Sequence, residues 1–146
     1  MNHVKAAYYG TLAALSAAGS VVANLLGGWD AALQTLCIMM AADYLTGVVC
    51  ALVWKKSPKT TDGAYESKAS IKGLFRKAGI LLAVLVAYQL DALSGTDFIR
   101  TSTILFFTAN DGLSVLENLG LMGLPIPQAV KNAFEVLRDK SGTKEK

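Results

Sequence analysis

Residues 36–54 read LCIMMAADYLTGVVCALVW and hold a single charged residue, Asp43, inside an apolar run. As a helix this stretch would extend about 28 Å, close to the thickness of the bilayer's hydrocarbon core. An aspartate at the centre of a membrane helix costs about 2.5–3.5 kcal/mol, so it normally faces a partner group, a water-filled cavity or another copy of the chain. Asp43 is therefore a candidate functional residue. The alternative is a hydrogen-bonded or protonated aspartate that only fixes helix packing.

The composition of the whole chain also indicates a membrane protein. Of the 146 residues, 53% are hydrophobic and 17% are charged, and the mean hydropathy is +0.40. These values are too apolar for a soluble domain of this size. The net charge of +3 could suggest nucleic-acid binding, but the basic residues lie between apolar runs, where membrane orientation explains them. We expect no nucleic-acid partner.

Several further classes of protein are not supported by the sequence. Cys37 and Cys50 lie inside the apolar run, without a CxxC spacing or a nearby histidine, so we expect packing residues and neither a disulfide nor a metal site. No cofactor is expected. Lys5 precedes an apolar segment as in a signal peptide, but no A-x-A cleavage site follows, so we expect a retained helix.

Four apolar segments organise the chain. They cover residues 6–26, 31–53, 78–93 and 99–121, and the first two are joined by the turn Gly27–Asp30. Residues 128–138 predict a short amphipathic helix, and the charged tail 139–146 is expected to be disordered. The predicted fold is therefore an all-α integral membrane protein of one domain, with about four transmembrane helices, a basic cytoplasmic loop and a C-terminal amphipathic helix.

Two of these segments carry small residues at four-residue spacing, which lets another helix approach closely. These candidate packing residues are Gly10, Ala14, Ala18, Gly79, Ala83 and Ala87. We expect them to favour self-association, although small residues are common in any membrane helix. Asp91 continues the second stripe and is expected near the outer interface, where water would solvate it.

The segment 99–121 is polar in its second half. Asn110, Ser114, Glu117 and Asn118 fall on one helical face with Asp111 at its edge, so a polar stripe runs from mid-membrane toward the inner surface. An interfacial helix would show the same pattern if the membrane span ended early, and this alternative stays open.

The basic residues predict the orientation. The loop between the second and third spans carries Lys55, Lys56, Lys59, Lys68, Lys72, Arg76 and Lys77. Its amphipathic end is expected to lie on anionic lipid headgroups, with a DNA-binding arm as the alternative. With four spans and both termini cytoplasmic, 13 of the 14 Lys and Arg residues lie inside, and Arg100 alone lies outside. A three-span topology would move Lys5 or the basic tail outside.

The order of several short motifs resembles the toxin-secretion and phage-lysis holin family. The motifs are DYLTG at 43–47, SKASIKGL at 67–74 with a following Arg-Lys pair, the helix carrying Asp91, NDGLSVLEN at 110–118 and GLPIP at 123–127. The resemblance spans nearly the whole chain. Two features depart from the family pattern: Asp111 replaces a glutamate, and the next methionine after Met1 is Met39, which argues against a second start codon.

The resemblance implies a bacteriophage, prophage or toxin-locus protein that has no enzymatic activity. Such a protein accumulates in the bacterial inner membrane, forms homo-oligomers and opens lesions, so that an endolysin or toxin leaves the cytoplasm and the host lyses. The endolysin or toxin need not touch it. On this hypothesis the residues for assembly or lesion lining are Asp43, Thr46, Asn110, Asp111, Ser114, Glu117 and Asn118.

Two alternative functions are a small transporter and a membrane enzyme. A small proton-coupled or cation transporter could use Asp43 and Asp111 as its ion site, although residues 6–53 and 78–121 show no convincing internal repeat. A membrane enzyme could use Asp43, Asp111 and Glu117 as metal ligands or as acid and base. The spacing does not support the enzyme, and His3 is the only histidine.

Overall fold

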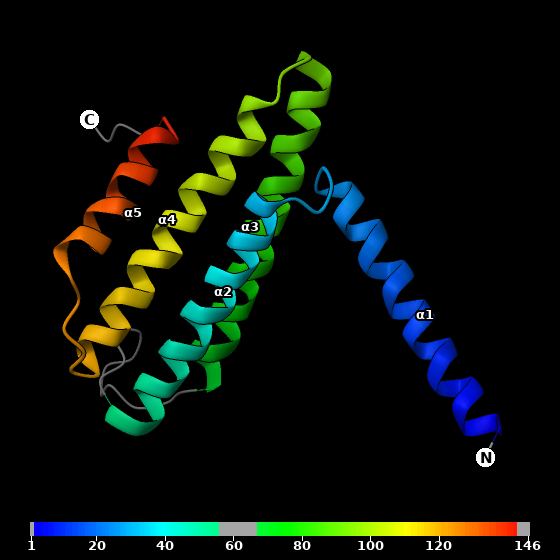
Figure 1. Ribbon diagram of the computed structural model, residues 1–146, viewed down its shortest axis with the longest axis horizontal. Coiled ribbons are helices and arrows are strands. Elements are labelled where there is room, and N and C mark those ends of the chain that lie inside the picture. The colour runs from blue at the N-terminus through cyan, green and yellow to red at the C-terminus, as the bar shows by residue number, and fades with distance from the viewer. Residues whose placement is uncertain (1, 56–66, 143–146) are drawn as a thin grey trace.

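The computed structural model describes residues 2–55 and 67–142, and all regular structure in them is helical (Figure 1). The elements are α1 (Asn2–Leu25), α2 (Ala31–Val49), the π-helix η1 (Cys50–Trp54), α3 (Ser67–Ser94), α4 (Phe98–Leu121) and α5 (Gln128–Lys140). The expected basic residues Lys56 and Lys59, and the last four residues of the tail, lie outside the described part.

Helices α2, α3 and α4 form a bundle, with α5 packed on α4. An apolar cluster fills the half of the bundle that holds the N-terminal parts of α2 and α4: Leu26, Leu33, Leu36, Met40, Ile80, Val84 and Ile104. Many other large apolar side chains point outward, among them Leu45, Phe75 and Leu82. Apolar side chains on the surface with charges inside suit a lipid environment. Two described helices, His3–Leu25 and Ala31–Trp54, are long and apolar enough to cross a membrane.

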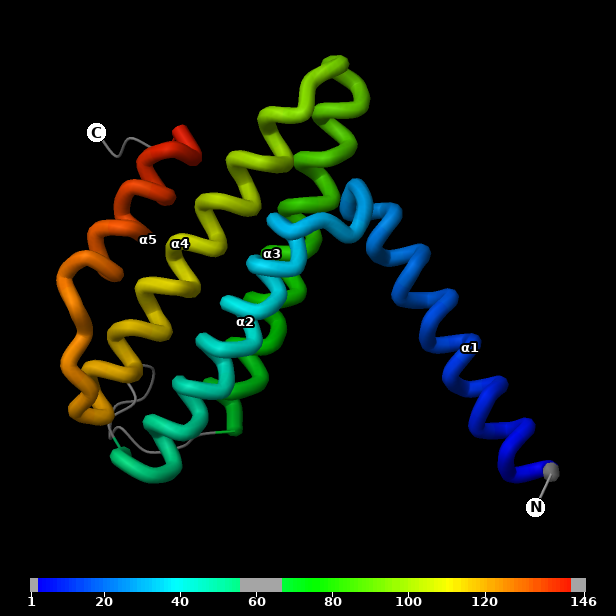
Figure 2. The backbone as a smooth tube through the Cα atoms, viewed as in Figure 1, coloured from blue at the N-terminus to red at the C-terminus, as the bar shows by residue number. Residues whose placement is uncertain are grey.

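Helix α1 diverges from the bundle (Figure 2). Gly27 and Gly28 have φ angles of 90° and 98°, and the amide of Gly28 donates to the carbonyl of Ala23 at 2.8 Å. This left-handed glycine ending terminates α1 and turns the chain into α2. Along α1 the candidate packing residues Gly10, Ala14 and Ala18 are exposed and do not pack against the other described helices. In the described part of the chain, α1 is joined to the bundle at its C-terminal end, where Leu26 packs in the apolar cluster.

Helix α3 begins earlier than expected, at Ser67 and not near residue 78. Lys68, Lys72, Arg76 and Lys77 therefore belong to the first turns of α3 and not to a separate amphipathic segment. The physical reason is that residues 67–77 hold no proline and consist mostly of helix-compatible residues. A hydrogen bond of 2.6 Å between the hydroxyls of Tyr44 and Ser70 also ties this end of α3 to α2.

Candidate functional site: a buried ion triad

Each helix of the bundle contributes one charged side chain to a buried triad. The ammonium Nζ of Lys77 on α3 donates a hydrogen bond to Oδ2 of Asp43 on α2, at 2.6 Å. The same ammonium lies 2.7 Å from Oδ2 of Asp111 on α4. Asp43, Lys77 and Asp111 have exposed fractions of 4%, 8% and 4%. Charges this deeply buried are tolerated only when they are paired.

The triad contains two carboxylates and one ammonium group. The contact from Lys77 to Asp111 is an ion pair without hydrogen-bond geometry, and Oδ2 of Asp111 accepts no hydrogen bond from the described residues. The ammonium takes the position that a bound cation would occupy between two carboxylates. The described residues also contain no cluster of three or more potential metal ligands from His, Cys, Asp and Glu. The arrangement therefore holds three helices together electrostatically.

A second polar contact links α2 and α4 closer to their C-terminal ends. The amide Nδ2 of Asn118 donates to the hydroxyl of Thr46 at 3.0 Å, and that hydroxyl donates to the carbonyl of Ala42 at 2.8 Å. Asn118 is almost fully buried. Because a buried amide without a partner is costly, this bond fixes how α4 packs on α2.

The structure divides the predicted polar stripe of α4 between two environments. Asp111 and Asn118 point into the bundle, Asn110 and Ser114 are half-buried, and Glu117 is exposed. Asp43, Thr46, Asp111 and Asn118 are thus brought together as internal contacts between helices. The remaining stripe residues lie toward or on the outer surface of α4.

Lys77 was expected at the lipid surface with the other basic residues, and this expectation is wrong. Lys77 is buried because it is the cation that neutralises the carboxylates of Asp43 and Asp111. Lys55, Lys68, Lys72 and Arg76 are exposed. The missed signal is helical periodicity: the buried residues of α3 are Lys77, Ile80, Val84, Ala87 and Asp91, which follow a spacing of three and four residues. Along the same helix, Gly79 is exposed and Ala83 is half-buried.

At the opposite end of the bundle Arg100 joins α4 to the turn before α2. Its Nη1 atom lies 2.6 Å from Oδ2 of Asp30, and its Nε and Nη2 atoms donate to the carbonyls of Leu26 and Gly28 at 2.5 and 3.2 Å. The hydrogen bond from Arg100 lowers the pKa of the Asp30 carboxyl. Asp30 also caps α2, because its Oδ1 accepts from the amide of Leu33 at 2.8 Å.

Asp91 is also buried at this end, contrary to the expected solvation. Its carboxylate accepts hydrogen bonds from the Thr96 hydroxyl and the Ile99 amide, at 2.5 and 3.0 Å, and from the Arg100 amide at 2.7 Å. The first amides of a helix have no partner within that helix. Asp91 of α3 supplies these partners to α4, whereas the adjoining Asp97 forms no such cap.

We predict that Asp91→Ala destabilises the bundle by about 1–2 kcal/mol, because it removes the acceptor for the first amides of α4. The matched control is Asp97→Ala, which removes a carboxylate beside the same turn without losing a capping bond. Denaturant unfolding of the purified proteins in detergent micelles, followed by circular dichroism, measures the difference. Equal stabilities of the two variants would contradict the capping role of Asp91.

The sequence that forms this bundle matches a known protein family. The model of the bacteriophage holin family matches residues 20–139. The chain belongs to this holin family. The match runs from the end of α1 through α2, α3 and α4 to the last turn of α5, so it includes the triad and both ends of the bundle.

The chain is also similar to bacterial and phage proteins, one of which is a probable holin. The chain is 36% identical to an uncharacterized 14.9 kDa protein in the nagH 3' region of Clostridium perfringens, over 84% of this chain and 88% of that protein. It is 33% identical to an uncharacterized protein of Listeria innocua, over 87% and 86% of the two chains. A probable holin of Bacillus phage phi105 is 29% identical, over 77% and 78%. No solved structure matches this holin-family chain.

Proposed function

We propose that this chain acts as a holin with four membrane spans, α1 to α4, in the bacterial inner membrane, both termini being cytoplasmic. It accumulates, forms homo-oligomers and opens lesions through which an endolysin or toxin leaves the cell, and it does so without catalysis. The observation that carries the proposal is the buried triad of Asp43, Lys77 and Asp111, found in a chain that belongs to the holin family.

The triad supports a two-stage action. A chain with its charges paired internally can enter the bilayer and accumulate, because the cost of unpaired intramembrane charges is avoided. At high density the free energy falls when the same charged and amide groups exchange their internal partners for groups of another copy or for water. The residues at these internal contacts, Asp43, Asp111 and Asn118, then line the lesion. The outward Glu117 contributes to contacts between copies.

Other surfaces of the chain fit the partners of a holin. The exposed basic residues at the start of α3, Lys68, Lys72 and Arg76, suit anionic lipid headgroups at the cytoplasmic surface. The exposed small residues of α1 suit close packing against a second copy. An endolysin or toxin needs no contact with the chain, because it leaves through the lesion by diffusion.

One observation favours a second candidate, a small proton-coupled transporter: the structure brings the two predicted ion-site carboxylates, Asp43 and Asp111, to one cation. Lys77 argues against a cation site, because a resident ammonium already occupies it. Proton coupling would require a carboxylate of the triad to titrate during transport. The two candidate functions differ in what crosses the membrane: a holin releases macromolecules, whereas a transporter moves protons.

Expression in bacteria tests the proposal. We expect normal growth followed by an abrupt loss of membrane potential and escape of a large cytosolic reporter protein. Asp43→Asn should still insert and should shift only the time of release. Steady proton flux at low expression that Asp43→Asn abolishes, with no escape of the reporter, would support the transporter and contradict the holin.

A further inference from the structure

The packing of α5 on α4 depends on one close contact. The two helices run side by side in opposite directions (Figures 1 and 2). The ring of Phe134 lies directly over Gly112, so that a Cβ atom at position 112 would overlap it. Gly112 is buried in α4 beside Asp111. A glycine in a helix interior is unfavourable by itself, and here its missing side chain makes room for Phe134.

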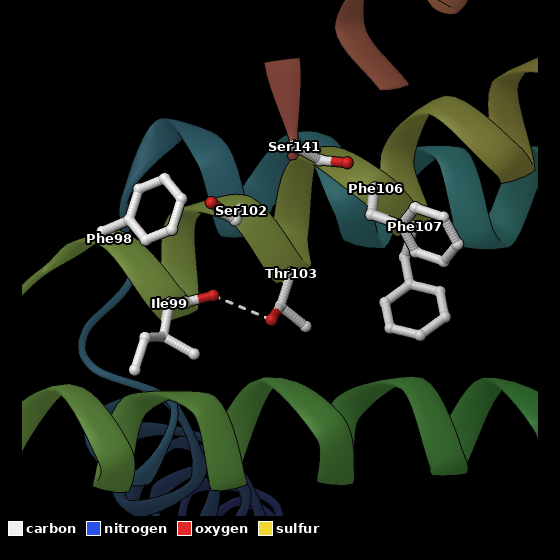
Figure 3. Close-up of a pocket in the computed structure, with 7 residues that line it drawn as sticks. All are labelled: Phe98, Ile99, Ser102, Thr103, Phe106, Phe107 and Ser141. Atoms are coloured by element: carbon white, nitrogen blue, oxygen red, sulfur yellow. Dashed lines mark hydrogen bonds between the residues drawn. The ribbon is translucent and has the colours of Figure 1, made fainter. Parts of the chain in front are cut away.

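The far end of α5 reaches the beginning of α4. Ser141, which follows α5 directly, is buried and lines one cavity together with Phe98, Ser102 and Phe106 of α4 (Figure 3). From Phe134 to Ser141, α5 therefore lies alongside the first half of α4, between Gly112 and Phe98. If α4 crosses the bilayer, this part of α5 lies at the level of the hydrocarbon core.

The outer face of α5 is incompatible with lipid at that depth. Its charged residues are Lys131, Glu135, Arg138, Asp139 and Lys140, and none of them is buried. Unpaired charges facing acyl chains are strongly unfavourable. The docked position of α5 thus requires water on its charged face, whereas an undocked amphipathic helix can lie on the cytoplasmic membrane surface.

We propose that α5 lies undocked on the membrane surface while the chain accumulates, and that it docks on α4 through Phe134 and Gly112 as the lesion opens, while the triad is still paired. Docked α5 then forms the water-facing wall of the lesion. This inference rests on the proposed holin function. The segment between the helices allows the change of position, since Gly123 has a φ of 91° and Pro125 and Pro127 prevent α4 from continuing into α5.

Matched glycine substitutions in α4 test the docking contact. Gly112→Ala places a methyl group against Phe134, whereas Gly120→Ala meets nothing within 4 Å. Both replace a helical glycine with alanine and gain the same helix propensity. Phe134→Ala removes the ring from this contact and should weaken docking as Gly112→Ala does.

Docking is measured by cross-linking Ser102→Cys to Ser141→Cys with a short bifunctional thiol reagent, after Cys37 and Cys50 are replaced by alanine. Release of a cytosolic reporter is followed in the same cultures. We expect the cross-link to form only once release begins. Gly112→Ala should lower the cross-linked fraction about tenfold, which corresponds to about 1.4 kcal/mol, and should slow release. Gly120→Ala should match the unsubstituted protein in both measurements.

A fluorophore on Glu135→Cys in liposomes whose lipids carry bromine near the headgroup gives a second measurement. Quenching should be strong before opening and should fall when α5 faces water. Equal cross-linking before and after release, equal cross-linking of the two glycine variants, or unchanged quenching would overturn the inference while the holin function stands. Absence of reporter release from the unsubstituted protein would overturn the function itself, and with it the lesion wall.

Discussion

Lys77→Met is expected to destabilise the bundle by about 3–5 kcal/mol, because it leaves two buried carboxylates without their cation. Loss of this size is a large part of the stability of a small domain, so little folded protein should accumulate. Methionine is unbranched like lysine and only one atom shorter, so the main change is the loss of the charge. Denaturant unfolding in detergent micelles gives the difference in free energy, and immunoblots of membrane fractions give the accumulation.

Two controls separate the charge from other effects. Arg76→Met changes the exposed neighbour of Lys77 and should leave stability within about 0.5 kcal/mol of the unsubstituted protein. The triple variant Lys77→Met/Asp43→Asn/Asp111→Asn removes every charge of the triad and should recover much of the loss. If Lys77→Met behaved like Arg76→Met, Lys77 would lie at the membrane surface and the triad would not form.

Reporter fusions after Trp54, Gly95 and Lys146 are expected to report cytoplasm, outside and cytoplasm. The effect is all-or-none, because a reporter domain lies on one side of the membrane or the other. The expectation follows from the distribution of charge, which places 13 of the 14 basic residues in the cytoplasm. Arg100, which then lies outside, is paired with Asp30 and with the carbonyl groups at the end of α1.

Each fusion tests a different part of the topology. An outside signal after Lys146 would leave three spans and contradict the proposed topology. A cytoplasmic signal after Gly95 would mean that α3 does not cross the membrane. Fusions in the middle of a span, for example after Met40, serve as controls and should report neither side cleanly.

Helical periodicity and apolar length were enough to predict helices in the regions of α1, α2, α4 and α5. The limits of these helices were predicted from the turn residues that separate the apolar runs. The start of α3 was missed because a run of basic residues was assigned to the lipid surface, and such a run fits a long helix equally well. Composition alone does not distinguish the two, since the distinction depends on contacts with α2 such as that between Tyr44 and Ser70.

The sequence identified Asp43 as a residue in need of a partner, but not the partner itself. Lys77 lies at the edge of the basic loop, where a snorkelling side chain is the common outcome. Only the periodicity that Lys77 shares with the buried apolar residues of α3 indicated otherwise. Asp91 was missed for a related reason: its three donors come from the following turn and α4, and no local pattern reveals them. The docking of α5 is equally nonlocal, because its amphipathic pattern suits a membrane surface as well as a helix.

The most direct test of the account uses purified protein and liposomes that hold both a small dye and a folded protein of endolysin size. No other membrane protein is present, so any release comes from this chain. Above a threshold ratio of protein to lipid, the account predicts abrupt release of both contents, and below that ratio it predicts release of neither. Release of the small dye alone, rising steadily with the amount of protein and without a threshold, would contradict a lesion that passes macromolecules.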